Sequence, residues 1–226
     1  FAFTMQKLQK TSTGRKILVA FIFLMAFMSY YPYQLIFNPN VYLENRDYIY
    51  FPIKTGENFD DVAHKLRDNH IISDYISFRF ISKLMKYDKN VKAGMYKIDN
   101  NLTNIQLVRM LRNKGITVKV TFNNLRTKKD IAQQVCKDLE ADDAQFLKLL
   151  NNPEFVSKYG FDTFSVVSIF LPNTYEFYWN TNEVALFEKM NNEFKQFWNE
   201  NRLAQAKKIN LTPLEVVTLA SIVEAE

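Results

Sequence analysis

The sequence predicts an α+β fold that begins with a transmembrane helix and continues as a mixed α/β module and a mainly helical region. Three patterns support this prediction: an uncharged apolar run over residues 17–37, alternating strand patterns within residues 47–122, and helical spacing of apolar residues beyond residue 127. The chain of 226 residues is long enough to bury a sizeable core, and 47% of it is hydrophobic. Its 5 glycines and 6 prolines argue against a collagen-like or largely disordered chain.

The net charge of +5 is unevenly distributed along the chain. Four positive charges, Lys7, Lys10, Arg15 and Lys16, precede the apolar run, and subtracting them from +5 leaves +1 for all remaining residues. A nearly neutral remainder lacks the basic surface that nucleic acid requires, so we expect no nucleic-acid partner. A basic tail before an apolar run instead indicates membrane topology, with residues 1–16 on the cytoplasmic side.

Residues 17–37 form an apolar run without Asp, Glu, Lys or Arg. As a helix, these 21 residues span about 30 Å, which matches the hydrocarbon core of a bilayer. A cleaved signal peptide is the alternative, but the run is long and does not end in an Ala-x-Ala pattern. We therefore predict a retained single-pass transmembrane helix with the lipid bilayer as a partner, followed by a linker over residues 38–46 and an exported region.

Residues 47–122 are predicted to form a mixed α/β module. Alternating apolar residues indicate strands, while apolar residues at spacings of three and four indicate helices. In chain order we expect a strand, two helices, a strand, a helix and a strand, at residues 47–54, 58–69, 74–86, 93–98, 103–113 and 116–122. The strand–helix–helix–strand order at the start is the pattern of a LysM-like module.

Beyond residue 123 the sequence becomes mainly helical. We expect helices at residues 128–139, 142–150, 153–159 and 183–199. The short apolar run over residues 166–171 suits a strand. The last helix has the clearest start, because Thr212, Pro213 and Glu215 provide an N-cap, a proline at the first helical position and a capping box. Apolar residues follow on most sides of this helix and predict that it is buried.

Common catalytic and metal-binding motifs are absent from the sequence. It contains no GxGxxG, GxxxxGK[ST], HExxH or GxSxG pattern, and its single cysteine excludes a multi-cysteine metal site. Cys136 falls within an amphipathic predicted helix and is interpreted as a packing residue. The two histidines, His64 and His70, are interpreted as surface or structural residues. We therefore expect no metal and no cofactor.

Two segments are candidates for chemistry, and the first is residues 169–179, with the sequence IFLPNTYEFYW. It places Asn173, Thr174, Tyr175 and Glu176 directly after an apolar run. Aromatic rings beside hydroxyl and amide groups can stack on sugars and hydrogen-bond to their hydroxyls, so these four residues are candidate substrate-binding residues. The alternative is an ordinary turn whose aromatic side chains pack inward.

The second segment is residues 219–226, LASIVEAE, at the end of the last predicted helix. A carboxyl group that follows an apolar helix face loses hydration, which favours its protonated form and suits a general acid. The alternative is a solvated glutamate at a helix end. Spacing alone leaves the choice between Glu224 and Glu226 open, because helical residues two positions apart point about 200° apart.

The apolar N-terminal run, the LysM-like pattern, LPNTYEFYW and LASIVEAE together resemble the endolytic murein transglycosylases, the MltG or YceG-like family. The likeness covers residues 48–226, and the family's hallmark segments, approximately LFPDTYEF and ASIVEKE, correspond to residues 171–177 and 220–226. The chain departs from these segments at Asn173, where Asp is common, and at Ala225, where Lys is common.

The resemblance implies that Glu224 is the catalytic glutamate, and we retain Glu226 as a candidate substrate-binding residue. It implies cleavage of the β-1,4 bond between N-acetylmuramic acid and N-acetylglucosamine in nascent glycan strands, which leaves a 1,6-anhydro end. Peptidoglycan strands and the synthases that extend them are the implied partners. The expected location is a bacterial inner membrane, with the bulk of the chain on its outer side.

The same resemblance predicts that residues 123–226 are the N-terminal portion of a catalytic domain, because the family continues beyond the position of Glu226. The alternative function, from a different class, is a non-catalytic peptidoglycan-binding or scaffold protein of the membrane. Digestion of glycan strands distinguishes the two, since only the enzyme produces 1,6-anhydro ends.

Overall fold

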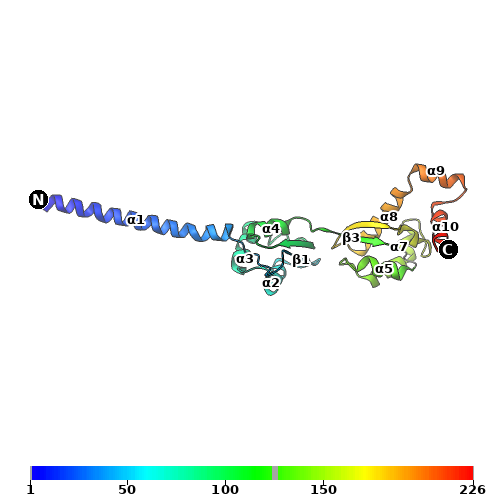
Figure 1. Ribbon diagram of the computed structural model, residues 1–226, viewed down its shortest axis with the longest axis horizontal. Helices are drawn as coiled ribbons and strands as arrows, with labels where there is room; N and C mark the ends of the chain where they lie inside the picture. The colour runs from blue at the N-terminus through cyan, green and yellow to red at the C-terminus, as the bar shows by residue number, and fades with distance from the viewer. Residues whose placement is uncertain (1, 124–126, 226) are drawn as a thin grey trace. The chain divides into compact units, whose positions relative to one another are not determined.

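The chain has an α+β fold, as predicted, in which helices are accompanied by two small sheets (Figure 1). The computed structural model describes residues 2–123 and 127–225. These residues form two compact units. The first unit comprises Phe1–Phe51, Glu57–Lys92 and Lys97–Asn113, and the second comprises Pro52–Gly56, Ala93–Tyr96 and Lys114–Glu226.

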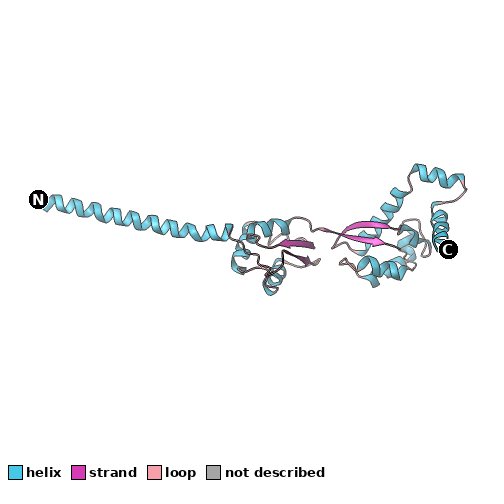
Figure 2. Ribbon diagram, viewed as in Figure 1, coloured by secondary structure: helices cyan, strands magenta, loops and turns pink. Residues whose placement is uncertain are grey.

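The elements before Lys114 follow the order expected from the sequence, and Figure 2 distinguishes the helices from the strands. They are α1 (Ala2–Phe37), β1 (Tyr48–Ile53), α2 (Phe59–Asp68), α3 (Tyr75–Leu84), β2 (Gly94–Asp99) and α4 (Asn104–Arg112). Strands β1 and β2 pair in a two-stranded sheet. Helix α2 buries its predicted apolar face, whereas α3 buries Phe78 and Ile81 and leaves the expected face residues Ile76, Phe80 and Leu84 exposed.

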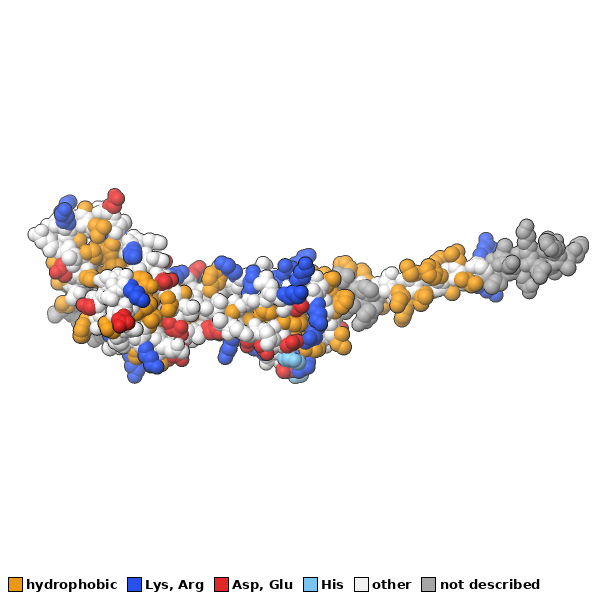
Figure 3. All heavy atoms as spheres, turned by 180° about the vertical axis from the view of Figure 1, so that it is seen from behind, with side chains coloured by type: hydrophobic (Ala, Val, Ile, Leu, Met, Phe, Trp, Pro, Cys, Tyr) orange, Lys and Arg blue, Asp and Glu red, His pale blue; other side chains and the backbone are white. Residues whose placement is uncertain are grey.

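Helix α1 covers the segment predicted to cross a membrane, and apolar side chains are exposed along it (Figure 3). Across the part of the chain that the structure describes, however, no helix is both long enough and apolar enough to span a bilayer. The prediction of a transmembrane helix over residues 17–37 is therefore wrong. Ser29, Tyr30 and Gln34 fall within that segment, and their polar groups lower its mean hydropathy.

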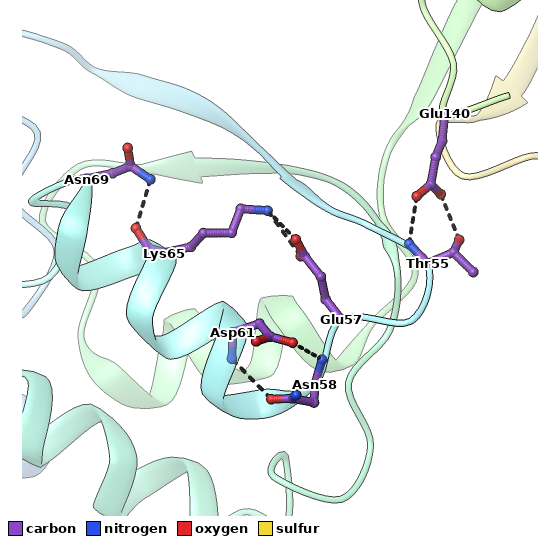
Figure 4. A network of polar contacts seen from close by, with 7 residues as sticks. All are labelled: Thr55, Glu57, Asn58, Asp61, Lys65, Asn69 and Glu140. Carbon is purple, nitrogen blue, oxygen red and sulfur yellow. Dashed lines mark hydrogen bonds and ion pairs between the residues drawn. The ribbon is translucent and has the colours of Figure 1, made fainter. Parts of the chain in front are cut away.

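The start of α2 is fixed by side chains that satisfy backbone N–H groups left free at a helix end. Asn58 Oδ1 accepts a hydrogen bond from the Asp61 N–H at 3.1 Å, and Asp61 in turn accepts one from the Asn58 N–H at 2.9 Å (Figure 4). Lys65 forms an ion pair with Glu57 at 2.9 Å. The reciprocal capping box of Asn58 and Asp61 ends the turn after β1 and starts the helix.

A buried polar network joins the segment after α1 to α3 and α4. The Asn40 side-chain amide donates to Asn104 Oδ1 at 2.7 Å, and the Asn104 amide donates to Ser77 Oγ at 2.9 Å. Asn40 Oδ1 accepts a hydrogen bond from the Asp74 N–H at 2.6 Å. Because Asn40, Ser77 and Asn104 are almost fully buried, these hydrogen bonds offset the cost of removing their polar groups from water.

The elements from Lys114 onward include the predicted helices, with bounds shifted by a few residues. They are β3 (Thr117–Phe122), α5 (Lys128–Cys136), α6 (Asp143–Leu150), α7 (Pro153–Ser157), the 3-10 helix η1 (Ser165–Ile169), β4 (Asn173–Tyr178), α8 (Glu183–Phe197), α9 (Glu200–Lys208) and α10 (Pro213–Ala225).

Three segments of this region differ from the sequence prediction. Residues 166–171, expected as a strand, lie mostly in η1, because a short apolar run does not by itself distinguish a strand from a helical turn. Residues 173–178, for which a turn was one interpretation, form β4. Residues 200–208, for which no element was expected, form the mostly polar helix α9.

Strands β3 and β4 form an antiparallel pair in which Thr117 faces Tyr178 and Phe122 faces Asn173. Because residues alternate between the two faces of a strand, the pair buries one row of side chains, including Tyr175, in the core of the second unit. The predicted domain boundary after Phe122 groups β3 with the first region, whereas here the strand is paired within the second unit.

Two short segments from earlier in the chain are attached within the second unit. Both oxygens of the Glu140 carboxylate accept hydrogen bonds from Thr55, from its N–H and its hydroxyl, each at 2.7 Å (Figure 4). Gly94 lies against Gly115, where a Cβ atom would come within 2.7 Å of the Met95 carbonyl oxygen. Only glycine permits this close approach of two backbones.

Candidate functional site

The second unit contains a cavity of about 870 Å³, within the size range of small-ligand sites. Residues from the end of β3, η1, the segment before β4, α8, α9 and α10 line it. Aromatic and aliphatic side chains form most of the lining, and amide and hydroxyl groups lie among them. The fold therefore brings together residues as far apart in the sequence as Phe122 and Ser221.

One part of the lining is a face of α10. Val217, Ala220 and Ser221 line the cavity there. Residue 224 follows them by seven, four and three positions, and residues at these spacings share one face of an α-helix. The backbone of α10 therefore places residue 224 on the helix face whose preceding turns line the cavity, while the Glu224 side chain and the whole of Glu226 lie outside the described part of the chain.

A capping box holds the start of α10. The Glu215 carboxylate accepts hydrogen bonds from the Thr212 N–H at 2.7 Å and the Thr212 hydroxyl at 2.8 Å, and Thr212 Oγ1 accepts one from the Glu215 N–H at 3.3 Å. The Thr212 N–H, followed by its hydroxyl, lowers the pKa of Glu215 because hydrogen bonds favour the charged carboxylate. The capping box thus fixes the start of the helix that carries Glu224.

A second part of the lining comes from Leu171 and Pro172, at the start of LPNTYEF. The Tyr175 hydroxyl donates a hydrogen bond to the Leu171 carbonyl at 3.0 Å, and its ring packs edge-on against Phe122 with centroids 5.4 Å apart. Burial raises the pKa of Tyr175, so its hydroxyl stays a donor at neutral pH. Both segments singled out in the sequence therefore contribute to one cavity.

An exposed aromatic ring lies at the edge of the cavity. Phe164 lines it and is 88% exposed. The Asp162 carboxylate accepts hydrogen bonds from the Phe164 N–H at 2.8 Å and the Ser165 N–H at 2.6 Å, and these bonds, that from Ser165 first, lower the pKa of Asp162. A turn fixed in this way holds Phe164 where its face is open to a ligand.

Helix α9 contributes a row of residues that the sequence analysis missed. Arg202, Gln205 and Ile209 line the cavity, and their spacings of three and four place them on one helix face. The Arg202 guanidinium donates to the Phe197 carbonyl at 2.7 Å and lies over the Phe197 ring, 4.1 Å from its centroid. The available signal for this helix is Asn199, whose side chain caps it by accepting the Arg202 N–H at 3.0 Å.

The candidate residues of the LPNTYEF segment are placed differently from Leu171 and Pro172. Asn173, Thr174 and Glu176 are exposed on β4, and none is among the described residues that line the cavity. Tyr175 is buried, as the alternative interpretation of inward packing expects. It therefore supports the lining through its hydrogen bond to the Leu171 carbonyl.

The remaining titratable candidates lie away from the cavity. Cys136 is buried in the core of the second unit, and burial, more than the nearby carboxylates, raises its pKa to about 12. His64 and His70 are exposed, and the His64 ring stacks with Tyr75 at 5.8 Å between centroids. Among the residues that the structure describes, no group of three or more His, Cys, Asp or Glu is arranged to hold a metal ion.

A family model described as the YceG-like family matches residues 51–226 of this chain. Since the match covers well over half of the sequence, the chain belongs to the YceG-like family. Among solved structures, it is similar to the crystal structure of a YceG-like protein from Listeria monocytogenes, with 21% sequence identity and a TM-score of 0.39. The similarity covers 74% of this chain and 60% of the Listeria protein. None of the curated proteins compared with the chain matches it.

Family membership confirms the resemblance inferred from the two sequence segments, and it supports a function related to peptidoglycan. This chain spans about 60% of the length of the Listeria protein. The comparisons give no support to the predicted LysM-like module, although the strand–helix–helix–strand order of β1, α2, α3 and β2 is present.

Proposed function

We propose that the protein is an endolytic peptidoglycan lytic transglycosylase and that Glu224 is its catalytic acid. The observation that carries this proposal is the shared cavity: Leu171 and Pro172 line it together with the face of α10 on which residue 224 lies. Membership of the YceG-like family supports the same reaction class. The substrate is the β-1,4 bond between N-acetylmuramic acid and N-acetylglucosamine.

The lining of the cavity suits a glycan. Sugars present apolar C–H faces, which stack on aromatic rings, and hydroxyl and N-acetyl groups, which hydrogen-bond to amides and hydroxyls. Phe164 and Trp198 provide rings, while Asn123, Ser168 and Gln205 provide polar groups. A mostly apolar cavity with a small number of polar groups is typical of sites that bind neutral organic ligands.

The reaction needs one carboxyl group that serves twice. Protonated Glu224 donates its proton to the glycosidic oxygen, the C1–O bond breaks, and N-acetylglucosamine leaves as an alcohol. The muramyl C6 hydroxyl then attacks C1 and returns its proton to the Glu224 carboxylate. Atoms balance without water, and the acid is regenerated.

This use of an internal nucleophile explains why one acid suffices. Ordinary glycosidases require a second carboxylate, either to attack the sugar or to activate water. A lytic transglycosylase supplies its nucleophile from the substrate itself, so the site needs only one acid–base group and a surface that holds the strand. Cavity-lining groups that are mostly aromatic, amide or hydroxyl are consistent with that requirement.

Product analysis tests the proposal. Purified glycan strands are incubated with the protein expressed from its whole gene, and the new ends are identified by mass spectrometry. We expect 1,6-anhydro-N-acetylmuramic acid ends, one water lighter than hydrolysis products. Reducing muramic acid ends would indicate a hydrolase, and unchanged strands that still bind the protein would indicate the non-catalytic scaffold.

We also propose that the protein acts on the outer side of the bacterial inner membrane, where nascent strands emerge from their synthases. An enzyme that terminates growing strands must meet them before they are cross-linked into the wall. Crosslinking in growing cells tests this location. Recovery of the protein with synthases and uncross-linked glycan supports it, whereas recovery from the cytoplasm alone contradicts it.

A further inference from the structure

Arg202 stands out among the residues that line the cavity because of its charge. Of the lining residues that the structure describes, it is the only one that carries a full charge. Within the same described part of the chain, no Asp or Glu forms an ion pair with it. This exposed guanidinium is chemically unlike the aromatic, aliphatic and neutral polar side chains that line the cavity with it.

The guanidinium of Arg202 is held in position from within the protein. One N–H donates to the Phe197 carbonyl at 2.7 Å, and the plane of the group lies over the Phe197 ring. A guanidinium has five N–H donors, so most of them remain available to a ligand. Because the group is already positioned, binding a ligand costs little additional side-chain entropy.

The position of Arg202 in α9 does not serve the helix itself. It lies in the first turn, where the helix dipole favours negative charge and disfavours a cation. An anion bound beside Arg202 would be attracted by the guanidinium, while Glu200 already places a carboxylate in the same first turn. The guanidinium, which lines the cavity and has no ion-pair partner among the described residues, is therefore the observation that indicates an anion as the ligand.

We propose that Arg202 binds a carboxylate carried on the muramyl sugar and thereby selects the strand that the cavity accepts. The inference rests on the proposed function, since hydroxyl and N-acetyl groups of a glycan strand are neutral and its carboxylates are the groups that match a guanidinium fork. That carboxylate comes either from the lactyl group of a strand without peptides or from the stem peptide of an intact strand.

The test compares strands that differ only in this charge. Peptide-free strands carry a free lactyl carboxylate, the same strands after methylamide coupling are neutral, and peptide-bearing strands carry carboxylates only in the stem. For each kind of strand, KM is measured from the formation of anhydro product, and Kd is measured with the inactive variant Glu224→Gln. For the wild type, we expect both KM and Kd to be about 10-fold lower for one of the two carboxylate-bearing strands than for the neutral strand. A difference of this size corresponds to one charge-assisted hydrogen bond.

The variant Arg202→Gln is expected to abolish this preference, and Arg202→Lys to retain part of it, because lysine keeps the charge but loses the fork. Lys207→Gln is the matched control, since it removes a positive charge from the same helix at a residue outside the cavity lining. A preference that survives in Arg202→Gln, or is lost equally in Lys207→Gln, overturns the inference.

The two proposals fail in distinguishable ways. If the wild type makes no anhydro product from any strand, the proposed reaction is wrong, while the Kd comparison still measures recognition of the carboxylate. If anhydro product forms but charged and neutral strands are bound equally, the reaction stands and the role of Arg202 is wrong. A preference for the peptide-free strand identifies the lactyl group, and a preference for the peptide-bearing strand identifies the stem peptide.

Discussion

At the scale of single residues, a few side chains hold the cavity lining in place. Tyr175 is the clearest example, since its hydroxyl reaches the Leu171 carbonyl and its ring packs against Phe122. It is a positioning residue, because burial keeps it from the ligand while its hydrogen bond fixes the chain at Leu171 and Pro172.

Replacing Tyr175 by Phe tests this role. The ring packing is retained and only the hydroxyl is lost, so the partly buried Leu171 carbonyl loses its hydrogen-bond donor. We expect the free energy of unfolding to fall by about 1 kcal/mol, the usual contribution of such a hydrogen bond. Chemical denaturation measures this change, and an unchanged midpoint would show that the hydrogen bond contributes nothing to the folded state.

Cys136 provides a second prediction at this scale. Burial raises its pKa to about 12, so almost no thiolate exists at neutral pH, and the thiolate is the reactive form. We expect its reaction with a thiol reagent to be very slow in the folded protein and fast after unfolding in denaturant. Rapid modification of the native protein would contradict the described burial.

At the scale of elements, α10 matters most because it carries Glu224. Its start is fixed by Thr212 and Glu215, and its cavity face is defined by residues such as Ala220. The helix is apolar on most sides, but the prediction that it is buried is wrong, because Leu219, Ile222 and Val223 are 50%, 56% and 68% exposed. Its register and its cap decide which residues meet the cavity.

Removing the cap by Thr212→Ala is expected to destabilise α10. The Glu215 N–H loses its acceptor and the Glu215 carboxylate loses a hydroxyl donor, which typically costs about 1 kcal/mol. Hydrogen exchange of the α10 amides measures the effect, with Thr218→Ala as a control that keeps the cap. Equal exchange in the two variants would contradict a specific role for the capping box.

The capping box also predicts a dependence on pH. The pKa of Glu215 is lowered in the folded protein, so its stabilising contribution is present above its ordinary value of 4.5 and is lost as the pH falls through the folded-state pKa. We expect the stability difference between wild type and Glu215→Gln to shrink on acidification. Thermal melts of both proteins at a series of acidic pH values measure this difference. A difference that grows as the pH falls would contradict the lowered pKa of Glu215.

Several elements could be predicted from the sequence because their signals are local. The cap residues of α10, the alternation of β3 and the helical spacing of α5 depend on neighbours within a few positions. The sequence leaves strand β4 ambiguous, because its pairing with β3 joins residues about fifty positions apart, as between Phe122 and Asn173. Helix α9 was missed because its mostly polar sequence has a weak apolar period.

At the scale of the whole molecule, the candidate site was predictable only in part. The sequence indicated two segments and one family, and the segments do meet at a cavity. It did not indicate that Leu171 and Pro172, rather than Asn173 and Thr174, would line that cavity, since this depends on which side of β4 packs inward. Arg202 was also out of reach, because its position depends on how α9 folds back within the second unit.

The central claim is that Glu224 is the proton donor, and the most direct measurement compares Glu224→Gln with Glu226→Gln in the glycan-strand assay. Both variants replace one carboxyl group by an amide of the same shape, at positions two residues apart, so each controls for the other. We expect Glu224→Gln to lower the rate of anhydro product formation by at least about 10²-fold with unchanged folding, and Glu226→Gln to retain most activity. Full activity in Glu224→Gln with loss in Glu226→Gln would contradict the account.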